Sequence, residues 1–149
     1  MIVDDLAEGN SDLSYAPRIL IVDDGPEVRA FFEQTLLEDG YYVTAVGTAR
    51  HGLRALSDGE FHVVVLDLSL PDGDGLEVVR QIRGEHPHLH IVAISGFMVG
   101  DMPTIAEAAG ATATLMKPTI PWELLNTVYR LLDPSFGWMG RSQGQTAGS

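Results

Sequence analysis

The sequence contains no cysteine, and this absence removes several kinds of chemistry at once. A chain without cysteine has no disulfide scaffold, no thiolate nucleophile and no cysteine-ligated zinc site. Long hydrophobic runs are missing as well, because segments such as Ile19–Val22 and Val63–Leu66 are far shorter than the ~20 apolar residues of a transmembrane helix. The N-terminus is acidic and lacks an apolar run, so we expect neither a secretory signal nor membrane association.

Basic residues are scarce, and this excludes a further class of function. Nine Lys and Arg oppose 21 Asp and Glu, which gives a net charge of −12. Nucleic-acid binders need a basic surface that displaces counterions from phosphates, so we expect no nucleic-acid partner. Eight of the nine cations are arginines, and the single lysine is Lys117. A lone ammonium group in such a chain suggests a specific role for this residue.

The composition favours one folded domain between two irregular ends. The chain has 149 residues, of which 45% are hydrophobic, and this suffices for the core of one domain. Residues 1–16 hold four acids and no base and are interpreted as an irregular acidic arm. Residues 134–149 are rich in Gly, Ser and Gln and are interpreted as a flexible tail, too short for a DNA-binding output domain. The folded domain is therefore assigned to residues 17–133.

Hydrophobic periodicity alternates between that of a strand and that of a helix along the folded domain. Short apolar runs predict strands, and apolar residues at intervals of three and four predict helices. The predicted strands are Arg18–Asp23, Tyr41–Val46, His62–Asp67, His90–Ser95 and Ala111–Met116, and the predicted helices are Glu27–Asp39, Thr48–Ser57, Leu76–Arg83, Met102–Ala109 and Trp122–Leu132. This alternation predicts a doubly wound α/β fold, with a five-stranded parallel sheet between five helices.

Polar residues follow the predicted strands at one edge of this sheet. Asp23 and Asp24 end the first strand, Asp67 ends the third, Ser95 ends the fourth, and Lys117 follows the fifth. Ligands of such sheets bind outside the carboxyl ends of the strands. Neighbouring carboxylates repel one another, and Mg²⁺ relieves that repulsion because it prefers oxygen ligands. Lys117 and Ser95 suit phosphoryl oxygens, so Asp67 is predicted to be a nucleophile that forms an aspartyl phosphate.

Four motifs, in this order, resemble the receiver domain of two-component response regulators. They are ILIVDD (19–24), VVVLDLSLPDGDGLEVVRQIR (63–83), IVAISG (91–96) and GATATLMKP (110–118). The resemblance covers about residues 17–133. It implies a flavodoxin-like topology with the strand order 2-1-3-4-5. It also implies a cytoplasmic phosphoprotein that is not an enzyme beyond its own phosphorylation and slow dephosphorylation.

The resemblance implies a role for each residue at this edge. Asp67 would accept a phosphoryl group from a phosphohistidine of a histidine kinase or of a histidine phosphotransfer protein. Ser95 would turn toward the phosphoryl group and Lys117 would pair with it. Mg²⁺ would be held directly by Asp24 and Asp67, through water by Asp23 and through its backbone carbonyl by Ser69. Phosphorylation would switch contacts with a downstream protein, and a homodimer is left open.

Three positions depart from the commonest receiver pattern. Thr114 stands where the fifth strand usually has an aromatic residue, Gly96 where Ala is common, and Thr119 where Phe is common. Thr114 cannot act as an aromatic rotamer switch, although the phosphorylation chemistry is unaffected. In receivers, the side chains at positions 69 and 97 border the path of the attacking water. The large apolar Phe97 therefore predicts slow loss of the phosphoryl group.

Two alternative functions are kept beside the phosphorelay receiver. A Mg²⁺-dependent phosphatase of the haloacid dehalogenase type also uses an aspartyl nucleophile, but its nucleophile normally ends the first strand, with a second acid two residues on. Here Asp67 ends the third strand and Ser69 stands two residues on. The other alternative is a receiver-like interaction module that takes no phosphate, and the complete set of acids, hydroxyl and lysine argues against it. The sequence also leaves open whether the chain is part of a hybrid kinase.

Some of these residues have a purely structural interpretation. Asp24 precedes the sequence Gly-Pro-Glu, which is typical of a helix N-terminus. The segment His86–His90 (HPHLH) has transition-metal ligands, but we interpret it as a loop before the fourth strand, opposite the acids. Trp122 and Tyr129 are predicted to be half-buried at the border of the last helix's apolar stripe, with a partner surface as the alternative.

Overall fold

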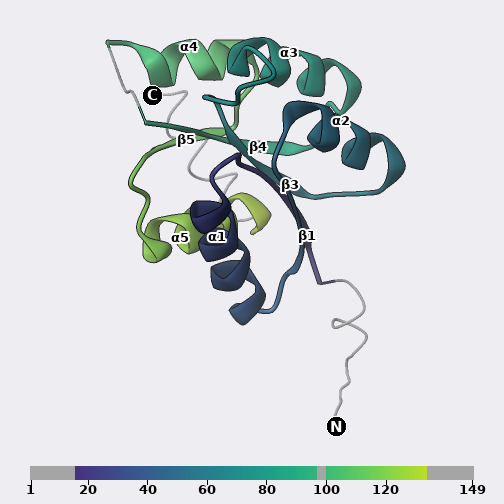
Figure 1. Ribbon diagram of the computed structural model, residues 1–149, viewed down its shortest axis with the longest axis vertical. Coiled ribbons are helices and arrows are strands. Elements are labelled where there is room, and N and C mark those ends of the chain that lie inside the picture. The colour runs from purple at the N-terminus through teal and green to yellow at the C-terminus, as the bar shows by residue number, and fades with distance from the viewer. Residues whose placement is uncertain (1–15, 97–99, 134–149) are drawn as a thin grey trace, which may run out of the picture.

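The computed structural model describes residues 16–96 and 100–133, and these residues form strands and helices in strict alternation (Figure 1). The elements are β1 (Arg18–Val22), α1 (Pro26–Glu38), β2 (Tyr42–Val46), α2 (Ala49–Asp58), β3 (Val63–Asp67), α3 (Gly75–Glu85), β4 (His90–Ser95), α4 (Met102–Ala109), β5 (Ala113–Met116) and α5 (Pro121–Leu132). Every predicted element is present, with ends shifted by at most two residues. The predicted arm, apart from Ala16, and the predicted tail lie outside the described residues.

The strands form one parallel sheet in the order β2-β1-β3-β4-β5, which confirms the predicted topology. Their register aligns the carboxyl ends, since Val22 lies opposite Leu66 and Asp67 lies opposite Ile94. The residues that follow the strands are therefore gathered at one edge. In the described part of the chain, no helix is both long and apolar enough to cross a membrane.

Each face of the sheet has its own hydrophobic core. Side chains of a strand alternate between the faces, so Ile19 and Ile21 of β1 pack with α1 and α5, whereas Leu20 and Val22 pack with α2, α3 and α4. Figure 1 shows this division, with α1 and α5 on one side of the sheet and the other three helices on the opposite side. Because both faces are covered, the strands are apolar at nearly every position.

The prediction for two aromatic residues of α5 was wrong. Trp122 and Tyr129 are 67% and 57% exposed, not half-buried. The buried stripe of α5 is centred on Leu124 and Val128, which are fully buried and lie four residues apart. Successive residues of a helix point about 100° apart, so Tyr129, next to Val128, already points away from the sheet. Apolar spacing alone does not show where the stripe ends.

Arg83 of α3 joins two loops at the amino-terminal edge of the sheet. Its guanidinium donates hydrogen bonds to the carbonyls of His86, Pro87 and Gly110 at 2.8–3.1 Å and to Thr112 Oγ1 at 3.3 Å. The backbone of Gly110 has φ +128°, and a Cβ there would lie 2.8 Å from Arg83 Cβ. Glycine therefore permits this close approach.

Replacing Arg83 with Met is expected to lower the free energy of unfolding by about 2 kcal/mol, because several partly buried carbonyls lose their donor. Urea denaturation would measure the change. Arg80→Met on the same helix is the matched control, because the Arg80 side chain is 51% exposed and its described partner is Glu77, at 2.9 Å. Its effect should stay within about 0.5 kcal/mol. Equal losses in the two variants would contradict the assigned role of Arg83.

Candidate functional site

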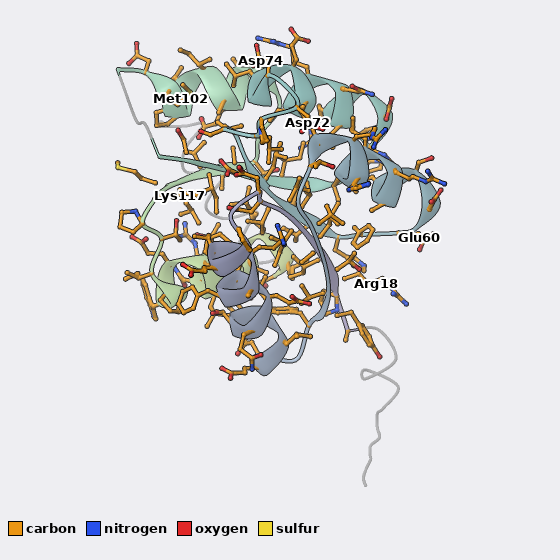
Figure 2. The ribbon with its side chains drawn as sticks, viewed as in Figure 1. Arg18, Glu60, Asp72, Asp74, Met102 and Lys117 are labelled. Atoms are coloured by element: carbon orange, nitrogen blue, oxygen red, sulfur yellow. The ribbon has the colours of Figure 1, made fainter. Side chains whose placement is uncertain are left out.

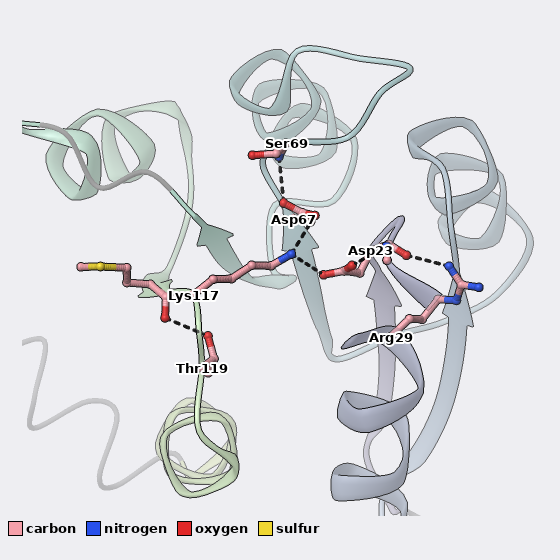
Figure 3. Close-up of polar contacts among 8 residues, drawn as sticks. Asp23, Arg29, Asp67, Ser69, Lys117 and Thr119 are labelled. Atoms are coloured by element: carbon pink, nitrogen blue, oxygen red, sulfur yellow. Dashed lines mark hydrogen bonds and ion pairs between the residues drawn. The ribbon is translucent and has the colours of Figure 1, made fainter. Parts of the chain in front are cut away.

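The predicted site residues lie at the carboxyl-terminal edge of the sheet, and Figure 3 shows Asp23, Asp67, Ser69 and Lys117 together there. Asp23 and Asp24 follow β1, Asp67 is the last residue of β3, and Ser95 is the last residue of β4. Lys117 follows β5, and its backbone N–H donates to the carbonyl of Ser95 at 2.9 Å. The parallel register thus brings together residues that lie up to 94 positions apart in the sequence, from Asp23 to Lys117.

One ammonium group pairs with two buried carboxylates. Lys117 Nζ lies 3.1 Å from Asp23 Oδ2 and 3.1 Å from Asp67 Oδ2. Both carboxylates are 2% exposed, so each charge requires a partner. Burial opposes the charge on the Lys117 ammonium, but the hydrogen bonds and charges of the two aspartates outweigh it and raise the Lys117 pKa. This pairing explains why the single lysine stands at this position.

The second oxygen of each buried carboxylate accepts a hydrogen bond from the backbone. Asp23 Oδ1 accepts from the N–H of Gly25 at 2.9 Å, and Asp67 Oδ1 accepts from the N–H of Ser69 at 2.8 Å. In both cases the donor is two residues further along the chain, as in an Asx-turn. These bonds hold the carboxylates of Asp23 and Asp67 toward Lys117.

Asp24 completes a cluster of three carboxylates. Asp23, Asp24 and Asp67 each offer an oxygen, and these oxygens lie within 4.8 Å of one another. Among the described residues, no other group of three metal-ligating side chains is this close. Three carboxylates and the Lys117 ammonium leave a net charge of −2, which a divalent cation neutralises. Because Asp24 is exposed, the cluster is open to water, and this donor set fits Mg²⁺.

Two neighbours of the site had no structural role assigned from the sequence. Arg29 of α1 donates from Nη1 to the backbone carbonyl of Asp23 at 2.9 Å. Thr119 is 8% exposed, and its hydroxyl donates to the carbonyl of Met116 at 3.0 Å, just before Lys117. Neither residue belongs to a chemical motif, although Arg29 lies one and a half helical turns after the acids and Thr119 follows Lys-Pro directly.

The remaining sequence predictions have mixed outcomes. The Lys117–Pro118 peptide bond is cis. Of the segment interpreted as a loop, residues 86–89 lie between α3 and β4, at the edge opposite the acids, as expected, whereas His90 is the first residue of β4. Phe97, on which the prediction of slow hydrolysis depends, lies outside the described residues. The structure places Ser69 and Ser95 beside Asp67 and Lys117, respectively, and their chemical roles stay predictions.

Comparison with known proteins agrees with the resemblance that the sequence motifs show. Residues 19–129 match the family described as the response regulator receiver domain. Protein PetR of Rhodobacter capsulatus is 37% identical over 120 residues, which cover 78% of this chain and 48% of PetR. A CheY-like receiver domain protein from Methanospirillum hungatei has a similar structure, with a TM-score of 0.76, 31% identity and coverage of 79% of this chain and 94% of that one.

A second solved structure, response regulator TrrA from Thermotoga maritima in complex with Mg²⁺-BeF, has a TM-score of 0.70 and 29% identity and covers 78% of this chain and 99% of that one. The chain spans about half the length of PetR, so its likeness to PetR concerns one domain of a longer protein. The strand order, the acids at the strand ends and the family match agree along most of the sequence. This chain belongs to the response regulator receiver domain family of two-component systems.

Proposed function

We propose that this chain is a phospho-accepting receiver of a histidine-to-aspartate phosphorelay and that Asp67 accepts the phosphoryl group. The observation that carries the proposal is the pairing of Lys117 Nζ with Asp67 Oδ2 and Asp23 Oδ2, both at 3.1 Å, beside the exposed Asp24. Asp67 ends a fully buried strand. One oxygen of its carboxylate accepts a hydrogen bond from the N–H of Ser69, and the other accepts one from Lys117 Nζ. A nucleophile held in one place needs little reorganisation before it reacts.

In the proposed step, a carboxylate oxygen of Asp67 attacks the phosphorus of a phosphohistidine. The new P–O bond forms as the P–N bond breaks, and the imidazole leaves with the electron pair. Lys117 then pairs with a phosphoryl oxygen, and the Ser95 hydroxyl donates to another. The partner is a histidine kinase or a histidine phosphotransfer protein, and the step takes place in the cytoplasm.

We propose Asp23, Asp24, Asp67 and the carbonyl of Ser69 as the residues that hold Mg²⁺. When bound, the ion supplies positive charge that offsets the carboxylates and the incoming phosphoryl oxygens. The Mg²⁺-BeF complex of TrrA supports this assignment, because that relative shares 29% identity and covers 78% of this chain. The net charge of −2 at the described site supports it independently.

The signal is proposed to pass to a downstream protein. Met116 and Ile120 flank the Lys117–Pro118 bond and are 53% and 54% exposed. Ile105 of α4 is 43% exposed as well. Met116 stands immediately before the lysine that would pair with the phosphoryl group and Ile120 stands three residues after it, so movement of Lys117 would be passed to these two residues along the chain. Thr114 is half-buried at the centre of β5, and the route requires no aromatic residue there.

The proposed function is tested by incubating the full chain with acetyl phosphate and Mg²⁺ and measuring its intact mass. A gain of one phosphoryl group per chain that requires Mg²⁺ is expected. Many turnovers of a generic aryl phosphate would instead favour the phosphatase. Absence of any mass gain with acetyl phosphate or with phosphorylated histidine kinases would favour the interaction module that takes no phosphate.

Replacing Asp24 with Asn is expected to raise the melting temperature in a chelator by about 2 °C, because one of three mutually repelling charges is removed. The same change should reduce the stabilisation that Mg²⁺ adds, since a ligand is lost. Differential scanning fluorimetry with chelator and with Mg²⁺ measures both effects. Asp58→Asn, an exposed acid of α2 outside the site, is the matched control. An unchanged response to Mg²⁺ in Asp24→Asn would contradict the assignment.

A further inference from the structure

One short segment, Val46–Arg50, contacts both loops that carry the proposed metal ligands. It ends β2 and begins α2, and it contains none of the proposed catalytic or metal-binding residues. The loop after β1 carries Asp23 and Asp24, and the loop after β3 carries Ser69. A common support for two ligand loops fixes the spacing between them.

The segment holds the first loop through two kinds of contact. The backbone N–H of Asp23 donates to the carbonyl of Val46 at 3.1 Å. The guanidinium of Arg29 donates to the carbonyl of Asp23 at 2.9 Å and lies directly on the backbone of Gly47. A Cβ at Gly47 would come within 2.8 Å of Arg29 Nη1, so a larger residue there would displace the end of this side chain. The loop that carries Asp23 is therefore fixed to this segment.

The segment holds the second loop through the carboxylate of Asp72. Asp72 Oδ1 accepts from the N–H of Ala49 at 2.9 Å, and Oδ2 accepts from the N–H of Arg50 at 3.1 Å. These N–H groups belong to the first turn of α2, where a helix leaves them without an internal partner. The hydrogen bonds from Ala49 and Arg50 lower the Asp72 pKa, so the residue is a carboxylate at neutral pH. Figure 2 shows Asp72 beside the start of α2, away from Asp74 at the start of α3.

The part of this loop between Asp72 and Asp67 is short and well anchored. Leu70 is 5% exposed and packs in the core, and the N–H of Ser69 donates to Asp67 Oδ1 at 2.8 Å. Two residues separate Ser69 from Asp72. Because the link is this short, a displacement of Asp72 would act on the backbone of Ser69 through only two residues.

We propose that Asp72 is a positioning residue, which sets the place of the Ser69 carbonyl relative to Asp23 and Asp24 by fixing the β3–α3 loop to the Val46–Arg50 segment. The inference rests on the proposed function, because it concerns the affinity of that same site for Mg²⁺. Partners that orient metal ligands typically contribute 10–100-fold to metal affinity. Asp72 would act in this way through the backbone rather than through a ligating side chain.

The experiment measures the dissociation constant of Mg²⁺ for the full chain by isothermal titration calorimetry, well below the melting temperature. Asp72→Ala is expected to raise this constant about 10-fold. Asp72→Asn should raise it less, because its amide oxygen still accepts one of the two hydrogen bonds. Thr48→Ala is the matched control, since Thr48 Oγ1 caps the same helix by accepting a hydrogen bond from the N–H of His51 at 3.0 Å. Its dissociation constant should equal that of wild type.

If Asp72→Ala and Thr48→Ala lower the melting temperature equally and neither changes Mg²⁺ affinity, Asp72 is a helix cap only and the proposal is overturned. If Asp72→Ala does not fold, Asp72→Asn decides, and a constant within about twofold of wild type overturns the proposal. Failure of the proposed function is a separate result. In that case the wild-type chain itself binds no Mg²⁺ and gains no phosphoryl mass, and both proposals fall together.

Discussion

Protein in which Asp67 is replaced by Asn is expected to gain no phosphoryl mass from acetyl phosphate and Mg²⁺, whereas wild type gains one group per chain. The amide of the variant is neutral and does not attack phosphorus as a carboxylate does. Because Asp67 also contributes one of three clustered carboxylates, the variant should bind Mg²⁺ more weakly as well. Intact-mass spectrometry, followed by peptide mapping of the wild-type product, measures the effect and locates the phosphoryl group.

The matched control for this experiment is Asp58→Asn, which removes the same charge from an exposed position of α2. Asp58 Oδ2 lies 3.8 Å from Arg54 Nε, and the Asp58 side chain is 70% exposed. It should gain the same phosphoryl mass as wild type. A phosphoryl gain of equal stoichiometry in Asp67→Asn would show that the acceptor has been assigned to the wrong residue. A melting temperature for Asp67→Asn near or above that of wild type would show that the variant is folded.

Replacing Gly75 with Ala is expected to lower the free energy of unfolding by about 3 kcal/mol, the largest loss of stability that we predict for a single change. A Cβ at Gly75 would lie 2.5 Å from Leu68 Cα, 2.8 Å from Leu68 C and nearer still to the Leu68 carbonyl oxygen. These are backbone atoms of the residue after Asp67, so no side chain can move aside. The loop after β3 must shift, and phosphorylation of Asp67 should slow as well.

Gly84→Ala, in the same helix, is the matched control for Gly75→Ala. A Cβ at Gly84 would meet nothing within 4 Å. Alanine favours a helix more than glycine does, so this variant should gain about 0.5–1 kcal/mol. Urea denaturation should show that the free energy of unfolding falls in Gly75→Ala and rises in Gly84→Ala, although the chemical change is the same. A small loss in Gly75→Ala, comparable to ordinary surface substitutions, would mean that the β3–α3 loop adapts more easily than its contacts indicate.

Placement of the charges links the fold to the proposed chemistry. Asp23 and Asp67 are buried at the ends of neighbouring strands, and Lys117 reaches both from the end of β5. A phosphoryl group on Asp67 would offer Lys117 a new partner of the same charge sign as Asp23. Under the proposed function, Lys117 would connect Asp67 to Met116 and Ile120, because these two residues stand immediately before Lys117 and three residues after it.

The sequence by itself determined the secondary structure and the edge at which the site lies, and its resemblance to receiver domains implied the strand order. Strands covered on both faces must be apolar at nearly every position, so β1, β3 and β4 are visible as short apolar runs. Parallel strands have their carboxyl ends at the same edge. Asp23, Asp67, Ser95 and Lys117 were therefore predicted to be neighbours from their positions after these runs, and the motif order identified the family.

Only the tertiary structure decided which polar side chains join distant parts of the chain. Asp72 contacts N–H groups that lie 22 and 23 positions away, and Arg83 contacts a carbonyl 27 positions away. Neither pairing leaves a periodic signal, because a single polar residue can bond to any backbone group that the fold brings near it. Exposure of Trp122 and Tyr129 was likewise decided by how α5 rotates against the sheet. Local patterns fix the elements and their order, whereas the rotation and spacing of packed elements fix the polar contacts.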